Sequence, residues 1–205
     1  MTIRLHRGDL PDLSAYKGAV AIDTETMGLD PDRDRLCVVQ LSPGDGSADV
    51  VQIAAGQKKA PNIERLLADT SLLKIFHYAR FDLGMLYKGF GVMAQPVYCT
   101  KIASRLVRTY TDKHGLKDLA RELLGIDLSK QQQLSDWGAD ELTDAQVSYA
   151  AADVLHLHAL KDKLDTMLAR EGRGELAAAC FGFLPDRARL DLAGWAREDI
   201  FSHSV

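Results

Sequence analysis

The chain has 205 residues, of which 46% are hydrophobic and 26% charged, an ordinary composition for one globular domain with a sizeable core. Its formal net charge of −4 argues against a protein that coats polyanions through overall charge, although a local cationic site is compatible with it. No apolar run is long enough to span a bilayer and the N-terminal stretch MTIRLHRGDL has no signal-peptide core, so we expect a cytoplasmic protein with no membrane partner.

Taken in chain order, the first part of the sequence predicts a sheet. Short runs of apolar and β-branched residues are typical of strands, and there are five of them: Ile3–His6, Val20–Thr24, Leu36–Leu41, Asp49–Ile53 and Leu73–His77. PGDG at Pro43–Gly46 is typical of a tight turn. We therefore expect the third and fourth strands to pair antiparallel.

Helical patterns dominate the rest of the chain. They predict helices over Asn62–Ala68, Arg80–Lys88, Thr100–Leu106, Leu116–Leu124, Thr143–Ala169, Glu175–Phe183 and Asp191–Ile200. Thr143 and Gln146 have the spacing of a capping box. Strands followed by helices favour a mixed sheet flanked by helices. No linker marks a second domain, so we expect one domain over residues 1–205, with a core at about 19–170 and a helical extension at about 172–205.

The three cysteines, Cys37, Cys99 and Cys180, show neither a disulfide framework nor the spacing of a zinc site. Cys37 and Cys99 lie among apolar or strand-like neighbours. We expect free thiols in a reducing compartment.

The stretch VAIDTETMGLD ends an apolar strand with two acids, Asp23 and Glu25. Residues two apart on a strand point to the same face, so the two carboxylates project together. Carboxylates that close repel each other, and a divalent cation removes the conflict. Oxygen ligands favour Mg²⁺ or Mn²⁺ over zinc. Taken alone, the pair is better explained as a solvated strand end.

Two later stretches carry further acids. In KIFHYARFDLGML, Asp82 lies in the first turn of a predicted helix, where the helix dipole favours an acid whatever its function. In QVSYAAADVLHL, Tyr149 and Asp153 are four residues apart and share a helix face, with small alanines between them. Each stretch taken alone also fits an ordinary helix.

The conjunction of the three stretches is specific. Asp-x-Glu, Asp and Tyr-x-x-x-Asp in this order resemble the DEDD superfamily of 3′–5′ exonucleases, in its DEDDy branch, and they occur here as DTE, HYARFD and YAAAD. LCVVQLS and the segment around SDW are similar to the ribonuclease D group. The short chain with its closing GWAREDIFSHS looks most like the nanoRNase C group.

The resemblance implies a ribonuclease H-like α/β fold with a mixed five-stranded sheet flanked by helices. It implies that two divalent cations, Mg²⁺ or Mn²⁺, are held by Asp23, Glu25, Asp82 and Asp153, with Asp23 bridging both, and that Tyr149 orients the attacking water. The implied activity is metal-dependent 3′–5′ hydrolysis of very short RNA, dinucleotides included, to 5′-mononucleotides. The implied assembly is a homo-oligomer, a ring-shaped octamer.

Candidate substrate-binding residues follow from the same alignment of motifs. The stretch TMGL allows two readings, since Met27 and Leu29 either wedge against a terminal base or anchor the loop, while Gly28 permits a tight turn. A 5′-phosphate pocket is expected from the basic residues that precede the helix at Leu116. The main candidates are Thr26, Met27, Gly28, Leu29, His77, Arg105, Arg108, Lys113 and His114, and further candidate cations are Arg80, Lys101 and Lys117.

Two alternatives stay open. A broader exonuclease would trim longer RNA or DNA, although an acidic chain has few cations with which to neutralise many phosphates. An inactive DEDD-fold protein would serve as a nucleic-acid-binding or assembly module. The intact acids and Tyr149 argue against that module, because a cluster of carboxylates without metal repels phosphate.

Overall fold

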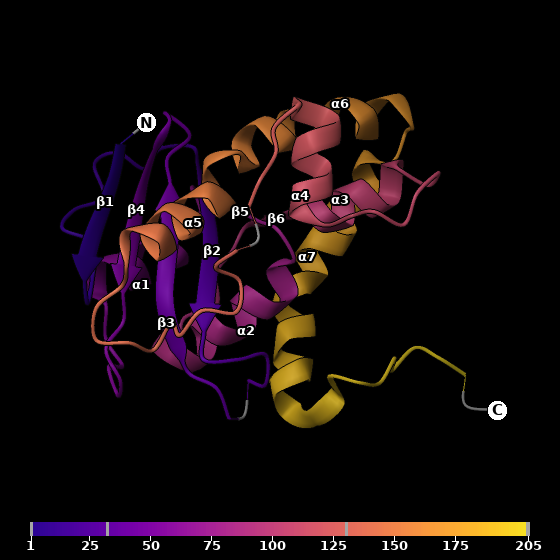
Figure 1. Cartoon of the computed structure of the whole chain (residues 1–205). Coiled ribbons are helices and arrows are strands. Elements are labelled where there is room, and N and C mark those ends of the chain that lie inside the picture. The colour runs from indigo at the N-terminus through magenta and orange to yellow at the C-terminus, as the bar shows by residue number, and fades with distance from the viewer. Residues whose placement is uncertain (1, 32, 130, 204–205) are drawn as a thin grey trace.

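The computed structural model describes residues 2–31, 33–129 and 131–203 and contains one mixed sheet with helices on both faces (Figure 1). The strands are β1 (Thr2–Arg7), β2 (Ala19–Thr26), β3 (Leu36–Ser42), β4 (Ser47–Gln52), β5 (Leu73–Phe76) and β6 (Val97–Cys99). Their order across the sheet is β1-β4-β3-β2-β5-β6. The pairs β2–β3 and β3–β4 are antiparallel and the other pairs are parallel, so the sheet is mixed as predicted.

The sheet has six strands where the sequence predicted five. The additional strand is β6, whose three residues pair parallel with β5 at the edge of the sheet. A run this short falls below the length at which alternation of side chains can be recognised. The antiparallel hairpin of β3 and β4 around PGDG is confirmed, with Gly44 and Gly46 at positive φ.

The helices are α1 (Pro61–Ala68), α2 (Ala79–Phe90), α3 (Thr100–Val107), α4 (Leu116–Leu119), α5 (Asp144–Leu155), α6 (Leu157–Arg170) and α7 (Gly174–Leu190). Two short π-helical segments, η1 (Ala120–Leu124) and η2 (Asp191–Trp195), continue α4 and α7. The capping box at the start of α5 is confirmed, with Gln146 N donating to Thr143 Oγ1 and Thr143 N to Gln146 Oε1. None of the described helices is both long and apolar enough to cross a membrane.

Two helix predictions were wrong in their extent. The single long helix is broken at His156 into α5 and α6, because α5 packs across β1 to β4 whereas α6 packs on α3 and β5, and one straight rod cannot do both. The last predicted helix forms only as η2, and residues 196–202 are turns and bends. By contrast, α7 extends to Leu190 and contains Pro185 within it.

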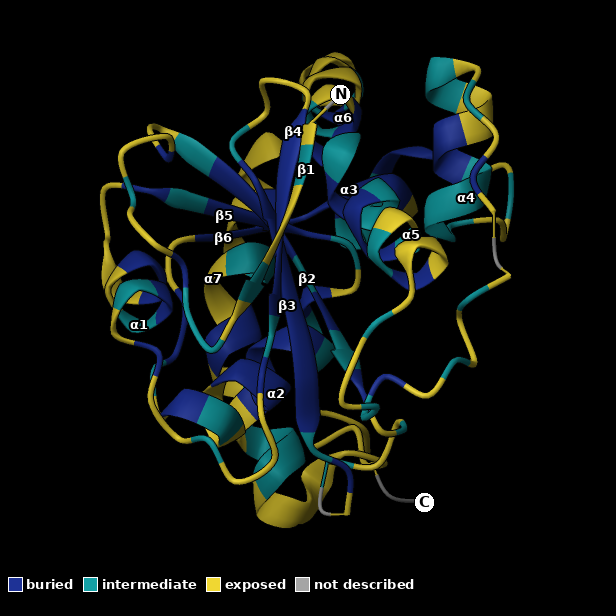
Figure 2. Cartoon of the chain, turned by 60° about the vertical axis from the view of Figure 1, so that its left-hand side comes forward, coloured by how far each residue is buried: buried dark blue, intermediate teal, exposed yellow. Residues whose placement is uncertain are grey.

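The core lies on both faces of the sheet (Figure 2). One face packs Ile22 and Leu41 against α1 and α2, and the other packs Ala21 and Val50 against α5 and α6. Because side chains alternate along β2, its polar residues point in turn to one face of the sheet and to the other. The three cysteines are free, as predicted from the sequence.

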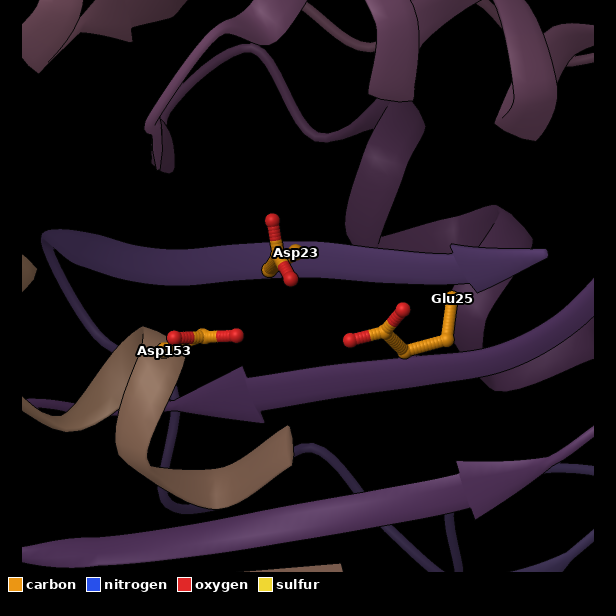
Figure 3. A group of neighbouring side chains, drawn as sticks. All are labelled: Asp23, Glu25 and Asp153. Atoms are coloured by element: carbon orange, nitrogen blue, oxygen red, sulfur yellow. The ribbon is translucent and has the colours of Figure 1, made fainter. Parts of the chain in front are cut away.

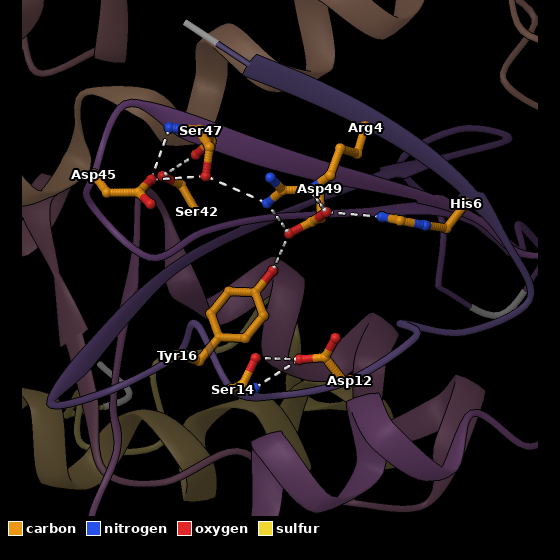
Figure 4. A network of polar contacts seen from close by, with 9 residues as sticks. All are labelled: Arg4, His6, Asp12, Ser14, Tyr16, Ser42, Asp45, Ser47 and Asp49. Atoms are coloured by element: carbon orange, nitrogen blue, oxygen red, sulfur yellow. Dashed lines mark hydrogen bonds and ion pairs between the residues drawn. The ribbon is translucent and has the colours of Figure 1, made fainter.

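The exposed edge strand β1 is held to β4 by a buried carboxylate. Asp49 of β4 accepts hydrogen bonds from Arg4 Nε at 2.6 Å and from the Tyr16 hydroxyl at 2.6 Å, and its Oδ1 lies 2.7 Å from His6 Nε2 (Figure 4). Arg4 is also the residue that faces Asp49 in the parallel register. The Asp49 network thus pins the register of a strand that has few buried apolar side chains of its own.

Candidate active site

Three acids converge above the carboxyl half of β2. Asp23 and Glu25 share the face of β2 that also carries the buried Ala21, and Asp153 comes down onto this face from the last turn of α5 (Figure 3). One carboxylate oxygen from each of these acids can be chosen so that all three lie within 4.8 Å of one another. The expected grouping of Asp23, Glu25 and Asp153 is therefore present in the fold.

Asp82 reaches the same cleft from the opposite side of the strand. It lies in the first turn of α2 and is buried. Thr24, which points to the α2 face because it alternates with Asp23, donates its hydroxyl to Asp82 Oδ1 at 2.6 Å. Asp82 thus has one oxygen already oriented by the sheet. The cleft has a volume of about 320 Å³, and all four acids and Tyr149 line it.

The electrostatics of this cluster favour the protonated acids. Burial, followed by repulsion from Asp82, raises the pKa of Asp23 well above its usual value. Burial and then the charges of Asp153 and Asp82 raise the pKa of Glu25 to about 9. Burial also raises the pKa values of Asp82 and Asp153 to about 7 each, although hydrogen bonds from Thr24 and Tyr149 oppose the rise. No cationic side chain is among the causes that set the pKa values of these four acids.

One neutral donor is supplied by the neighbouring strand. Gln40 of β3 faces Asp23 in the antiparallel register and donates Nε2 to Asp23 Oδ2 at 2.8 Å. Gln40 is fully buried, and its Oε1 has no hydrogen-bond partner among the described residues. The amide therefore fixes one oxygen of Asp23 and leaves the other directed into the cleft. Sequence reasoning missed Gln40, although one polar residue within the apolar run LCVVQLS was a usable signal.

Tyr149 lies one helical turn before Asp153 and keeps its proton. Burial, and then the charges of Asp153, Glu25 and Asp23, raise the pKa of the Tyr149 phenol above its usual value. Its ring packs against the buried Trp137, with ring centroids 6.0 Å apart. The segment around Trp137 is in turn held by Gln146 Nε2, which donates to Asp136 O at 3.0 Å. A protonated, packed phenol is suited to hold a hydrogen-bonded water.

The TMGL loop is placed beside the cleft. Leu29 lines the cleft and has 83% of its surface exposed. Met27 is also exposed, but its sulfur lies against Gly138, so Met27 contacts the loop that carries Trp137. The reason for glycine at position 28 differs from the expected turn: an added Cβ would collide with the Asp34 carboxylate. Thr26 donates its hydroxyl to Gly28 O and so shapes the loop.

The basic candidates are scattered. His77 lines the cleft, with Nδ1 2.8 Å from Thr100 Oγ1, and burial followed by the Lys101 charge lowers its pKa to about 3, so it is neutral. Arg108 is fully buried and holds Lys113 O and Glu122, so the expected phosphate contact is wrong for Arg108 and its role is structural.

Three more candidates also lie outside the lining of the cleft. Lys113 is exposed, and His114 pairs its Nδ1 with Ser104 Oγ at 2.8 Å. Arg105 lines a neighbouring cavity. The two lysines that do line the cleft are Lys101 and Lys117. Lys101 and Lys117 were among the candidate cations of the sequence, and a phosphate contact by either residue stays a prediction.

Comparison with known proteins agrees with this geometry. A family model described as a 3′–5′ exonuclease matches residues 10–169. Ribonuclease D of Granulibacter bethesdensis is 38% identical over 154 residues, which are 75% of this chain and 38% of that protein. The chain spans less than half the length of this and the other curated ribonuclease D relatives that it matches.

Solved structures match the chain over its whole length. Brucella melitensis NrnC with bound Mg²⁺ is 62% identical, with a TM-score of 0.96 and full coverage of both chains. The same protein bound to pGG is 63% identical, with a TM-score of 0.97 and full coverage of both chains. The fold and the relative placement of its elements are therefore shared with these structures.

Proposed function

Because this chain belongs to the family of 3′–5′ exonucleases, within the ribonuclease D-like group, we propose that it is a metal-dependent 3′–5′ exoribonuclease of very short RNA. Its substrates would be small single-stranded oligomers, dinucleotides included, and its products 5′-mononucleotides. The observation that carries the proposal is the cluster of Asp23, Glu25 and Asp153, whose ligand oxygens lie within 4.8 Å of one another beside Asp82.

The donor set fits two divalent cations of the Mg²⁺ or Mn²⁺ type. All candidate ligands are carboxylate oxygens, which suit hard cations, and repulsion among them is relieved by positive charge. Asp23, Glu25, Asp82 and Asp153 would hold the ions, with Asp23 shared between them. Bound cations would neutralise charge on the phosphate and lower the pKa of a water to roughly 7. The relative with 62% identity was solved with Mg²⁺ bound.

The residues of the chain position the reacting groups. Gln40 Nε2 holds one oxygen of Asp23, and the Thr24 hydroxyl holds one oxygen of Asp82. Tyr149 keeps its proton, so its hydroxyl orients the attacking water rather than removing a proton from it. The contacts from Gln40 and Thr24 fix two of the acids before a substrate arrives, which reduces the reorganisation that accompanies the reaction.

A short substrate suits the cleft. Its volume of about 320 Å³ is at the small end of ligand pockets, and only two lysines line it. Affinity for a long strand grows with the number of neutralised phosphates, which this cleft does not supply. Leu29 stands exposed at the cleft, where an apolar side chain can contact any base. A relative was solved with pGG bound.

Assembly and location are part of the same proposal. By resemblance to the nanoRNase C group, the chain forms a homo-oligomer, a ring-shaped octamer, in the cytoplasm. Light scattering coupled to size-exclusion chromatography measures the number of subunits directly. A monomer at micromolar concentration would contradict the ring. A ring in which basic residues of several subunits line one channel would instead favour the broader exonuclease, because such a channel can bind longer RNA or DNA.

Cleavage of 5′-labelled RNA tests the function. A dinucleotide, a short oligomer and a long single strand are each incubated with Mg²⁺ or Mn²⁺, with EDTA and the variant Asp23→Ala as controls. We expect the dinucleotide to disappear fastest, only with metal and only with Asp23. A dinucleotide that persists while the long strand is trimmed would support the broader exonuclease. If none of the three RNAs is cleaved, the result would support the alternative of an inactive nucleic-acid-binding module.

The role of Tyr149 has its own test. We expect Tyr149→Phe to reduce turnover by roughly 10- to 100-fold, because the water loses an orienting hydrogen bond while the ring still packs on Trp137. Steady-state rates on a dinucleotide measure this, with unfolding temperature as the control for packing. Full turnover in the Phe variant would show that the hydroxyl has no catalytic role.

A further inference from the structure

A second cavity adjoins the cleft. It has a volume of about 290 Å³ and lies between the start of α2, the helix α3 and the helix α7. We call it the cation pocket, and the lining residues that matter here are Tyr78, Arg80, Lys101, Arg105, Phe183 and Arg187. Tyr78 and Lys101 also line the cleft, so the two spaces share a wall.

The charged side chains that line this pocket are all positive. Four cationic side chains line it and no acidic residue does, in a chain whose net charge is −4. Arg80 and Arg187 both pair with the single carboxylate of Asp191, through Arg80 Nη2 at 2.7 Å and Arg187 Nη2 at 2.9 Å from Oδ1. One carboxylate therefore compensates two guanidinium groups. The Nε of Arg187 is buried and finds no partner in the described part of the chain.

The remaining two cations have no carboxylate partner among the described residues. Lys101 and Arg105 are one turn apart on α3, on the same helix face. Like charges at this spacing destabilise a helix unless an anion lies between them. Burial and then the charge of Arg105 lower the pKa of Lys101, which agrees with this arrangement. The pair is thus electrostatically incomplete in the protein alone.

The walls of the pocket are aromatic. The Tyr78 ring is 47% exposed and carries Lys101 Nζ 4.3 Å from its centroid. Tyr78 adopts a left-handed backbone with φ of 70°, a conformation that is strained for a non-glycine residue. Phe183 is 38% exposed on the opposite helix. Exposed rings beside free cations are the combination that stacks a base and holds a phosphate.

We propose that the cation pocket is a second binding site, which takes one nucleoside 5′-monophosphate, the product of the reaction. The inference rests on the proposed function for the identity of this ligand. A volume of about 290 Å³ suits one nucleotide better than two. Lys101 and Arg105 meet the phosphate, and the rings of Tyr78 and Phe183 meet the base. Because Tyr78 and Lys101 also line the cleft, an occupied pocket slows hydrolysis of the next substrate.

Binding is measured first without metal. In EDTA at pH 8, where Asp82 and Asp153 are deprotonated, the acids of the cleft repel phosphate, so calorimetric titration with adenosine 5′-monophosphate reports the pocket alone. We expect one saturable site per chain, at least tenfold weaker in Arg105→Ala and within twofold of wild type in Arg170→Ala. Arg170 is a matched control because it is exposed and lies outside both cavities. Adenosine and inorganic phosphate, titrated separately, should each bind more weakly than the nucleotide.

Inhibition then distinguishes the pocket from the cleft. With Mg²⁺, we expect the inhibition constant of adenosine 5′-monophosphate, divided by the KM for a dinucleotide, to rise at least tenfold in Arg105→Ala. If Arg105 served the substrate instead, both constants would rise together and the unchanged ratio would overturn the proposal. Displacement of the nucleotide, one for one, by an uncleavable dinucleotide in EDTA would overturn it as well.

The two proposals fail separately. Absence of saturable binding in EDTA, or equal binding by wild type and Arg105→Ala, overturns the pocket while hydrolysis of RNA stands. Arg105-dependent binding by a protein that hydrolyses no RNA supports the nucleotide site and contradicts the proposed function. Asp23→Ala should abolish hydrolysis and retain nucleotide binding, which supports a site independent of the acids.

Discussion

Asp49 and Asp23 are both carboxylates on strands of the same sheet, but the charges that surround them differ. Burial alone would raise the pKa of Asp49, yet hydrogen bonds from Arg4, Tyr16 and His6 lower it to about 2. Asp23 accepts hydrogen bonds from neutral donors, the Gln40 side-chain amide and the Thr24 backbone, and burial with neighbouring acids raises its pKa. Figure 4 shows Asp49 with Arg4, His6 and Tyr16 around it, whereas Figure 3 shows Asp23 beside the carboxylates of Glu25 and Asp153. A carboxylate that stabilises the fold carries its own cations, whereas a carboxylate reserved for chemistry lacks them.

The strongest test of this contrast is Asp23→Asn. We expect turnover of a dinucleotide to fall on the order of 10³-fold or more, since an acid proposed to hold both cations loses its charge. In EDTA the same variant should unfold at a higher temperature than wild type, because one repelling carboxylate is gone. Rates with Mg²⁺ and unfolding in EDTA measure the two effects. A lower unfolding temperature would contradict the idea that the cluster is destabilising without metal.

Asp49→Asn should instead lower stability and leave turnover unchanged. We expect the free energy of unfolding to fall by about 2 kcal/mol, because Tyr16 and His6 lose a charged acceptor while the partly exposed Arg4 keeps some solvation. Urea denaturation measures it, and Asp12→Asn, whose carboxylate is exposed, is the control. Below its unfolding temperature the Asp49 variant should hydrolyse RNA at the wild-type rate. A loss of turnover in the folded variant would show that the two regions are coupled.

Gln40→Leu removes the side-chain amide that β3 donates to Asp23. We expect the Mg²⁺ concentration needed for half-maximal rate to rise by roughly 10- to 100-fold, with the maximal rate largely restored at high Mg²⁺. Gln57→Leu is the matched control, because it loses amide bonds to Gly8 O and Lys59 O far from the acids. An unchanged Mg²⁺ dependence in Gln40→Leu would mean that Asp23 is oriented without the amide.

The smallest expected effect is a pH dependence of a few degrees in the unfolding temperature of metal-free protein. The pKa values of Glu25, at about 9, and of Asp82 and Asp153, at about 7, lie above those of unfolded carboxyls near 4. Their contribution is therefore fully present below pH 4 and is lost as the pH rises through 7 to 9. The pKa of Asp49 is lowered, so its contribution is lost instead as the pH falls from about 4 through 2.

Scanning calorimetry in EDTA between pH 5 and 9 should show a declining unfolding temperature. Mg²⁺ should raise it more at pH 8 than at pH 5, because the ions bind the deprotonated acids. A metal-free protein whose stability increases from pH 5 to 9 would be incompatible with the raised pKa values of the cluster.

Local periodicity predicted those parts of the site that depend on neighbours in sequence. Alternation along β2 places Asp23 with Glu25, and helical spacing places Tyr149 one turn before Asp153. Tertiary packing brings together the acids of β2, α2 and α5. The prediction that they meet came from the family resemblance. Neither source indicated Gln40, whose role depends on the register between β2 and β3.

The sequence was least informative where burial reverses the usual behaviour of a residue. Arginines are almost always exposed, yet Arg108 is fully buried because Ser104, Lys113 O and Glu122 take up its donors. The break at His156 was equally hidden, since the residues on both sides of it favour a helix and only packing on different partners divides them.

That break also has an electrical consequence. Because α5 ends at Leu155, the carbonyl end of its dipole lies beside Asp153 and adds partial negative charge there. Asp82 lies at the opposite pole, the amide end of α2, where partial positive charge opposes a cation. We therefore expect the two ion positions to be unequal, the one nearer Asp153 filling first, and a two-step calorimetric titration with Mn²⁺ would show it. The ends of two helices would thus set the order in which the site is loaded.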